Sequence, residues 1–313
     1  MEKTRNITFD IAKGIGIILV VIGHYIPEGA PSWYVGFTHF IYQFHMPLFF
    51  IIAGFFFERS SSDKGYWSLV GSKFKRLMIP YFILSWAVIV IKILSARFLP
   101  VDRPVAVDAL YRVFYLPEAG YYLWFVYVLF VIFCIAPLFK AGHRLVVLTL
   151  LAMGLVFWQS APEICCIVQL CRHLIFFVFG MWVSRIKFLE KAMCGYAPLW
   201  AGVTVLLFFL SPVDSPLSIL LWVIGGITGS FMVVAFSQAI SRINASVTNV
   251  LAYIGNMSMT IYLFHTLFMG GGKAILTYII SGGGIIEFMV SALFIIGTGI
   301  VCPVWLYKWV WTK

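Results

Sequence analysis

The stretch FDIAKGIGIILVVIGHY, residues 9–25, decides the fold because it is apolar enough to cross a bilayer and still carries an acid, a base and a histidine. At about 100° per residue along a helix, Lys13 and His24 lie within roughly 20° of one another, and Asp10 lies about 40° to the other side of His24. A rise of ~1.5 Å per residue separates Lys13 from His24 by about 16 Å. Because an ionisable group in hydrocarbon costs roughly 2.5 kcal/mol or more, this stripe must face protein or a wet cavity.

The composition is typical of a polytopic membrane protein. Of the 313 residues, 62% are hydrophobic and only 11% are charged, whereas soluble domains are about 25% charged. The net charge of +10 does not indicate nucleic-acid binding, because the basic residues lie mainly in short segments between apolar spans. Basic residues precede the first apolar run without a small-residue cleavage site, so we expect a retained first span rather than a signal peptide.

Apolar segments of membrane length predict an all-α integral membrane protein with about ten transmembrane helices, forming a single domain over residues 1–313. Most basic residues fall on inner segments if the N-terminus is cytoplasmic, so both termini are predicted to be cytoplasmic. Gly270–Gly272 and Gly282–Gly284 are expected to bracket a flexible or re-entrant outer connection. The predicted spans are 7–27, 37–57, 77–96, 121–139, 145–160, 172–186, 196–212, 216–238, 250–269 and 285–309.

This topology places histidines in the outer half of the membrane. His24 lies near the outer end of the first span, and His265 lies in the outer half of the ninth. His45 lies about two turns inside the second span, just before Pro47, which is expected to kink that helix. The outer starts of two further spans hold Trp124 and Arg172. The inner half holds four cations, of which the last three lie in a predicted basic loop over residues 58–81: Lys13, Lys73, Lys75 and Arg76.

Each of these residues also has a purely structural interpretation. A membrane histidine such as His45 or His265 is often an interhelical hydrogen-bond partner, worth about 0.6–2 kcal/mol. Trp124 with its neighbouring tyrosines is typical of an aromatic belt. Asp10 and Lys13, three residues apart, can neutralise each other. Three further histidines near span ends are interpreted as interfacial: His39, His143 and His173.

Familiar catalytic patterns are missing from the sequence. It has no zinc-ligand spacing, no glycine-rich phosphate loop and no serine elbow. Cys165, Cys166 and Cys171 could share one outer loop, but unpaired apolar cysteines are the interpretation we favour. A histidine acting as general base, without a metal, is what remains.

Five segments in order resemble the acyltransferase 3 family of integral membrane acyltransferases, in particular short members such as bacterial glycan and fucose O-acetyltransferases. In that family a basic residue, commonly arginine, precedes an essential histidine with ten residues between them, which maps onto Lys13 and His24. Lysine keeps the charge but not the two-pronged geometry of arginine. The segments, between residue 9 and about 267, are FDIAKGIGIILVVIGH, FHMPLFFIIAGFFF, KFKRLMIPYFILSW, LWFVYVLF and IGNMSMTIYLFH.

The resemblance implies transfer of an acetyl group from cytoplasmic acetyl-CoA to a hydroxyl of an extracytoplasmic or lipid-linked carbohydrate, in a bacterial inner membrane. His24 is then the expected base, and His45 the first candidate to orient it. Gly14, Gly16 and Gly23 could allow close approach of the pantetheine arm. The expected donor-binding residues are Asp10, Lys13, Lys73, Lys75 and Arg76, and the expected acceptor-binding residues are Trp124, Arg172, Tyr262 and His265.

A protein of another class, a transporter or flippase for a lipid-linked sugar, would also show intramembrane charges and broken helices. It would not require a basic anchor and a histidine aligned on one helix. Release of free CoA from acetyl-CoA by the purified protein separates the two hypotheses.

Overall fold

A computed structural model describes residues 6–60, 65–96, 105–116, 123–140, 142–210, 216–276 and 284–311. These residues form helices and connecting segments, with no strand among them. They cluster into two compact units: Met1–Ile52 with Ile186–Lys313 form unit 1, and Ala53–Arg185 form unit 2. Helix α3 (His45–Arg59) passes from one unit into the other. The single domain predicted from the sequence stays a prediction.

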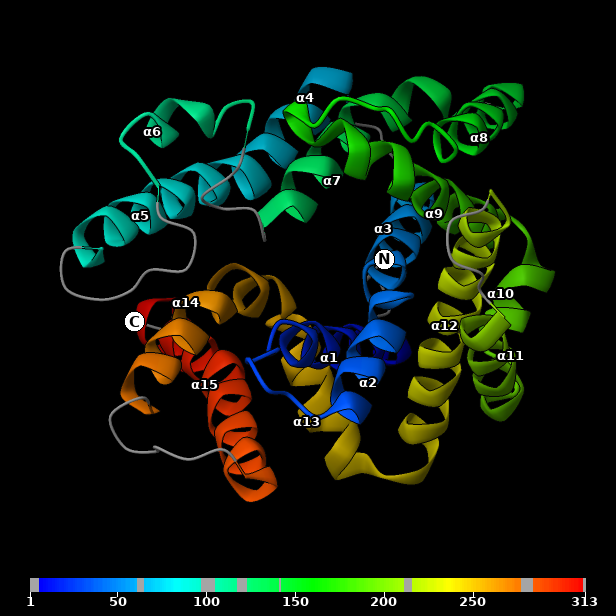
Figure 1. Ribbon diagram of the computed structural model, residues 1–313. Coiled ribbons are helices and arrows are strands. Elements are labelled where there is room, and N and C mark those ends of the chain that lie inside the picture. Colours follow the sequence, from blue (N-terminus) through cyan, green and yellow to red (C-terminus); the bar gives the residue numbers. More distant parts are fainter. Residues whose placement is uncertain are drawn as a thin grey trace. The chain divides into compact units, whose positions relative to one another are not determined.

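Helix α1 (Ile7–Gly23) forms the centre of unit 1 (Figure 1). Its apolar side chains include Ile11 and Val21, which are fully buried. Helix α1 packs against five of the other helices of the unit: α2, α12, α13, α14 and α15. Besides α1, the unit contains α2 (Ser32–Tyr42), α10 (Lys187–Met193), α11 (Ala197–Leu210), α12 (Pro216–Ile243), α13 (Ala245–Asn256), α14 (Ser258–Leu276) and α15 (Ile285–Trp311).

Helices α1 and α13 cross at backbone-to-backbone distance through two glycines. A β-carbon on Gly14 would collide with the carbonyl oxygen of Leu251, and one on Gly255 would collide with that of Asp10. Glycine is the only residue that permits such an approach, because it has no β-carbon. The two glycines therefore fix where α13 lies along α1.

Neighbouring helices fill the space beside the other two small residues of α1. A β-carbon on Gly16 would meet the side chains of Leu48 and Phe49, and one on Gly23 would meet the ring of Tyr42. With Gly14 against α13, all three glycines face protein. The prediction that they leave room for the pantetheine arm is therefore wrong, because other helices occupy that space. The sequence did not show which helices pack against these glycines.

Helices α7 (Trp124–Ile135) and α9 (Ile167–Arg185) hold the core of unit 2 together. Val128 and Ile132 of α7 and Phe176 and Phe177 of α9 are fully buried. The remaining elements are α4 (Tyr66–Lys73), the π-helix η1 (Phe74–Met78), α5 (Ile79–Ser95), α6 (Ala109–Arg112), the 3₁₀-helix η3 (Ala136–Phe139), α8 (His143–Leu155) and the 3₁₀-helix η4 (Ile164–Cys166).

The predicted basic loop over residues 58–81 is mostly helical. Helix α3 continues to Arg59, and α4, η1 and α5 follow one another without a break from Tyr66. Glycine and serine made this stretch look irregular in the sequence. Residues 61–64 lie outside the described residues.

Two further features of the C-terminal third differ from the prediction. The expected ninth span is divided at Met257, where α13 ends and α14 begins. Gly270–Gly272, expected in an outer connection, lie within α14, and Gly272 packs against Thr298 of α15. Gly282 and Gly283 lie outside the described residues. A small side chain at a helix–helix contact and a turn residue look alike in a sequence.

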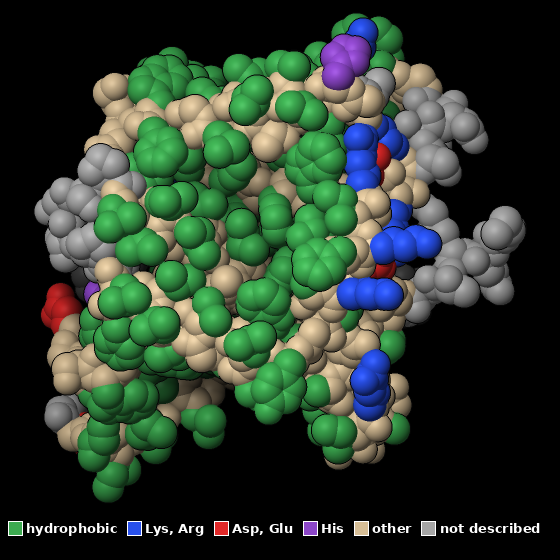
Figure 2. Space-filling model, turned by 90° about the vertical axis from the view of Figure 1, so that its right-hand side faces the viewer, with side chains coloured by type: hydrophobic (Ala, Val, Ile, Leu, Met, Phe, Trp, Pro, Cys, Tyr) green, Lys and Arg blue, Asp and Glu red, His purple; other side chains and the backbone are tan. Residues whose placement is uncertain are grey.

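The described helices include five that are long and apolar enough to cross a membrane. A sixth span results if α10 and α11, bent by 84° at their junction, are counted together. Hydrophobic side chains cover most of the face shown in Figure 2, and the lysine and arginine side chains in view lie at its margin. The all-helical membrane class is thereby confirmed. The number ten and the cytoplasmic termini stay predictions. The five spans are Ser32–Arg59, Tyr66–Ser95, Ile164–Arg185, Leu217–Ile243 and Ile285–Trp309.

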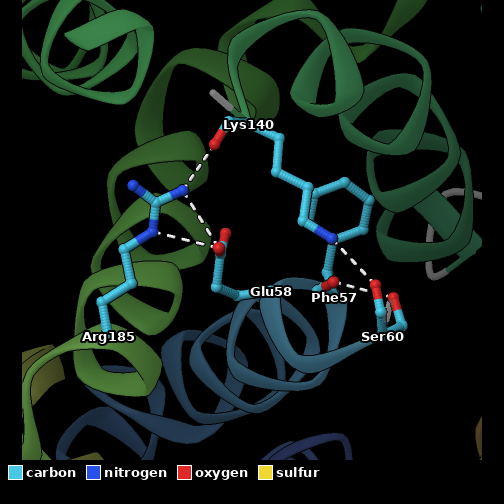
Figure 3. A network of polar contacts seen from close by, with 5 residues as sticks. All are labelled: Phe57, Glu58, Ser60, Lys140 and Arg185. Atoms are coloured by element: carbon cyan, nitrogen blue, oxygen red, sulfur yellow. Dashed lines mark hydrogen bonds and ion pairs between the residues drawn. The ribbon is translucent and has the colours of Figure 1, made fainter. Parts of the chain in front are cut away.

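A polar network in unit 2 joins the ends of three helical segments (Figure 3). The Arg185 guanidinium donates to Glu58 Oε1 at 3.0 Å and also to the carbonyl oxygen of Lys140. Lys140 Nζ in turn donates to the carbonyl oxygen of Ser60 at 2.8 Å and lies 5.5 Å from the centre of the Phe57 ring. Cations at helix C-termini satisfy carbonyls that the helix leaves open and complement its dipole.

Loss of the Arg185 side chain is expected to destabilise the protein more than loss of an exposed arginine. Arg185→Met leaves Glu58, whose side chain is 13% exposed, without its cation, at a cost of about 2 kcal/mol or more. The matched control is Arg112→Met, which removes the exposed pair with Asp108 and should cost about 0.2–1 kcal/mol. Thermal unfolding in detergent measures both variants. Equal melting temperatures would mean that the network contributes no stability.

Candidate active site

His24 directly follows α1 and caps that helix. Its side chain is exposed, and its backbone N–H donates within the last turn. Two tyrosines of α2 hold the carbonyls beside it: the Tyr34 hydroxyl donates to Ile22 O at 3.0 Å, and the Tyr42 hydroxyl donates to Gly23 O at 3.1 Å. The last carbonyls of a helix need partners from outside it, so these bonds stabilise the end of α1. The backbone that carries His24 is therefore held in place.

The ring of His265, on α14, lies beside the ring of His24. Their centroids are 5.0 Å apart and their planes are inclined by 52°. His265 is fully buried, and its Nδ1 lies 2.8 Å from Tyr262 O and 3.1 Å from Ile261 O. Since a carbonyl oxygen only accepts, Nδ1 carries the proton, and in the neutral ring Nε2 is the acceptor nitrogen. The buried ring therefore has a defined tautomer and orientation next to an exposed histidine.

His45 belongs to the same unit but contacts a different group. It is the first residue of α3, after the break in the helix before Pro47 that the sequence predicted. Its Nδ1 donates to Ile41 O at 2.9 Å, and its ring meets the Tyr42 ring edge-on with centroids 4.8 Å apart. Because the Tyr42 hydroxyl holds the last carbonyl of α1, His45 supports the end of that helix through Tyr42. Of the predicted partners, His265 and not His45 is the ring beside His24.

Asp10 and Lys13 form an ion pair at the other end of α1. Lys13 Nζ lies 2.7 Å from Asp10 Oδ1, and the two side chains are 27% and 8% exposed. About 14 residues, or roughly 21 Å of helix, separate Asp10 from His24. The sequence allowed two interpretations of these residues, a mutually neutralising pair or a site for the donor. The geometry shows the neutralising pair. Lys13 still has further N–H donors on its ammonium group for a ligand.

The other predicted donor-binding cations lie in unit 2. Lys73 is half-buried, with Nζ 3.9 Å from the centre of the Phe133 ring, which is a cation–π contact. Lys75 and Arg76 are exposed and follow it in the π-helix η1. All three project from one continuous helical segment. Their separation is therefore fixed by the helix, unlike that of residues on a loop.

Trp124 and His173 form a ring pair in unit 2. Trp124 begins α7, and its ring centroid lies 4.8 Å from that of His173 on α9. His173 is buried, and its Nδ1 donates to Gln169 O at 2.8 Å, which leaves Nε2 as the acceptor nitrogen. The Gln169 side-chain Oε1 is buried without a hydrogen-bond partner, and the neighbouring Arg172 is exposed.

His173 was expected at the end of a span and therefore at the membrane interface, whereas it lies inside a helix. Helix α9 begins at Ile167 rather than at residue 172, so His173 lies more than one turn inside it. One local signal in the sequence could have indicated the hydrogen bond between His173 and Gln169. Their spacing of four residues brings the His173 ring nitrogen to the carbonyl one helical turn earlier.

Unit 1 thus presents an exposed histidine at a fixed helix end, with a second histidine of defined tautomer beside it. An imidazole in that setting can accept a proton from a hydroxyl group. In the described part of the chain, no three His, Cys, Asp or Glu side chains lie together in a way that could hold a metal ion.

The profile of a known family, described as an acyltransferase domain, matches residues 6–308. The chain belongs to the acyltransferase 3 family. Two curated proteins are similar to it, and both are named nodulation protein NolL. The protein from Sinorhizobium fredii is 32% identical over 189 residues, covering 58% of this chain and 50% of its own length. The protein from Mesorhizobium japonicum is 30% identical over 150 residues, covering 46% of this chain and 38% of its own length.

Membership of the acyltransferase 3 family confirms the resemblance seen in the sequence and, at the level of the family, the prediction of an acyltransferase. The match runs through both units of the chain. The aligned region spans half or less of the length of the NolL proteins it matches. No solved structure matches the chain.

Proposed function

We propose that this acyltransferase 3 family member moves an acetyl group from cytoplasmic acetyl-CoA to a hydroxyl of an extracytoplasmic or lipid-linked carbohydrate. It does so from a bacterial inner membrane, with ten spans and both termini in the cytoplasm. The observation that carries the proposal is the pair of His24 and His265 at one end of α1, with the Asp10–Lys13 ion pair at the other end. A single helix then joins a donor-side anchor to an acceptor-side base.

In the proposed reaction His24 acts as general base. Its imidazole takes the proton of the acceptor hydroxyl while the hydroxyl oxygen attacks the carbonyl carbon of the thioester. The carbon–sulfur bond of the resulting tetrahedral intermediate then breaks, and the sulfur of CoA takes the proton from the imidazolium. His265 is proposed as the positioning residue, since its ring lies against that of His24 and limits how the His24 ring can turn.

The inner cations are proposed to attract the phosphate groups of the donor as it enters from the cytoplasm. Lys13 is held by Asp10 in a fixed position, and Lys75 and Arg76 are exposed on their helix. Phosphate groups attract such cations strongly where water is partly excluded. Lys73 lies against Phe133, so its role is proposed to be the support of the same helical segment.

The test of this function is transfer itself, measured on the purified full-length protein in lipid nanodiscs. Radiolabelled acetyl-CoA and an envelope glycan preparation should give acetylated glycan together with free CoA, in equal amounts. Acetylation of glycan by the membrane fraction but not by the purified protein would contradict the proposal. Movement of a lipid-linked sugar without any thioester cleavage would assign the protein to transport.

The acceptor is expected to depend on the aromatic ring of Trp124. Trp124→Ala should raise the KM for the glycan about tenfold or more and leave the Kd for acetyl-CoA unchanged. Tryptophan is enriched among the contacts whose loss costs about 2 kcal/mol or more, which exceeds the 1.4 kcal/mol that a tenfold change represents. The matched control is Trp67→Ala, since Trp67 belongs to the same unit and is 81% exposed. Kinetics run beside isothermal titration separate the two steps. Parallel loss of donor binding would show that Trp124 only supports the fold.

A further inference from the structure

An open surface hollow of about 340 Å³, called the cavity below, lies in unit 1 beside the first residue of α1. The proposed chemistry has not used it. It is lined by Ile7 of α1 and by Asn249, Ala252, Tyr253 and Asn256 of α13. Ligand pockets in proteins usually measure about 300–1,000 Å³, so this cavity is large enough for one ring system with its substituents. It differs from the surroundings of His24, which lie at the far end of α1.

The residues from α13 form one face of that helix. Their spacing of three, four and seven residues from Asn249 puts them side by side. Helix α13 turns Gly255 toward α1, which allows the close packing of the two helices. Toward the cavity it turns two amides and a phenol, set among apolar groups. Lipid-facing helices carry few polar side chains, since hydrocarbon does not solvate them. A polar, hollow face therefore indicates contact with water or with a polar ligand.

The chemistry of this face suits a purine base. Asn249 carries a carbonyl acceptor and an amide donor, the combination that pairs with the edge of adenine. The Asn256 amide donates to Ala252 O at 2.7 Å, and its carbonyl oxygen and second N–H remain for a ligand. Tyr253 adds an aromatic ring, on which bases stack. None of the five lining residues is charged, so the cavity itself does not repel an anion.

A cation lies next to the aromatic ring of the cavity. Lys308, in the last turn of α15, places its Nζ 5.4 Å from the centre of the Tyr253 ring. Lysine is a common partner of phosphate groups. A base on Tyr253 would thus have its phosphates within the field of Lys308, which makes a nucleotide the best-fitting ligand.

The distance between the cavity and His24 along α1 limits how short a shared ligand can be. Ile7 and His24 are 17 residues apart, which corresponds to about 26 Å of helix. A ligand that occupies the cavity and also reacts at His24 must therefore be long and extended, with a nucleotide at one end. We propose that the cavity receives the adenine and phosphate end of the acyl-CoA donor. Tyr253 stacks on the base, Asn249 and Asn256 bind its edge, and Lys308 faces the phosphates. This inference rests on the proposed function.

The experiment measures binding to the purified full-length protein by isothermal titration, with CoA and with adenosine 3′,5′-bisphosphate, which lacks the arm and the thiol. Tyr253→Leu and Asn249→Ala are expected to raise the Kd for both ligands at least tenfold. Tyr253→Phe keeps the ring and should keep the affinity. The matched control is Tyr196→Leu, an exposed tyrosine of the same unit, which should bind as the wild type does.

A second measurement uses an acyl-N-acetylcysteamine thioester, a donor without a nucleotide. Tyr253→Leu should transfer from it at the wild-type rate, which also shows that the variant is folded. Unchanged Kd values for CoA in Tyr253→Leu and Asn249→Ala, in a protein that transfers acetyl groups, would overturn the cavity assignment and leave the function standing. Nucleotide binding that depends on Tyr253, without any transfer by the wild type, would overturn the function and leave the nucleotide site standing. Loss of a co-purifying phospholipid in Tyr253→Leu, with CoA affinity unchanged, would assign the cavity to a lipid headgroup and overturn the proposal.

Discussion

His24→Ala is expected to reduce acetyl transfer by about 10²–10⁴-fold, the contribution typical of a general base. The alanine side chain cannot accept the hydroxyl proton, and the contact between the His24 and His265 rings is lost with the imidazole. The backbone bonds that Tyr34 and Tyr42 make to the end of α1 stay in place, because they involve the carbonyls of Ile22 and Gly23. We therefore expect an inactive protein that folds and binds donor normally.

The matched control for this variant is His143→Ala, which removes an exposed histidine at the start of α8. Transfer of radiolabelled acetyl to the glycan measures activity, titration with CoA measures donor binding, and thermal unfolding measures stability. A His24→Ala protein that retains most of its transfer rate would refute the assignment of the base. Equal losses in the two histidine variants would point to a general effect of substitution rather than to chemistry.

Gly255→Ala is expected to cost about 3 kcal/mol or more of unfolding free energy, although it adds a single methyl group. That methyl group would collide with the carbonyl oxygen of Asp10, and a main-chain atom inside a packed helix cannot move aside as a side chain can. Gly14→Ala should have a similar effect, because its β-carbon meets the carbonyl oxygen of Leu251 at the same crossing. Both substitutions force α1 and α13 apart.

Gly202→Ala is the matched control, since that glycine lies within α11 and a β-carbon there would meet nothing within 4 Å. Alanine in a helix interior is favoured over glycine by about 0.5–1 kcal/mol, so this variant should be as stable as the wild type or slightly more stable. Thermal melting in detergent, with size-exclusion profiles to report folding, compares the three variants. A Gly255→Ala protein that melts like the Gly202→Ala control would show that the two helices are free to separate at this crossing.

The fold class and the family of this protein could be predicted from the sequence. Apolar segments of membrane length and few charges determined an all-helical membrane protein, because each backbone N–H and C=O must be paired within its own segment in hydrocarbon. The alignment of Lys13 with His24 follows from the helical period alone. The ordered segments around these residues also predicted the family that the profile match then confirmed.

Features that depend on a single helix could therefore be predicted from the sequence. Examples are the break before Pro47 and the Asp10–Lys13 pair. The helical course of residues 66–78 and the division at Met257 were not, because serine and glycine occur both in loops and at helix contacts.

Only the tertiary structure decided which side chains meet. The sequence offered several partners for His24, and the structure places His265 beside it, with Tyr34 and Tyr42 at the carbonyls of the same helix end. These contacts join residues that are far apart along the chain, and the period of one helix does not set the register of another. That register is fixed where α1 and α13 touch, at Gly14 and Gly255, because two backbones can approach so closely only where both side chains are absent.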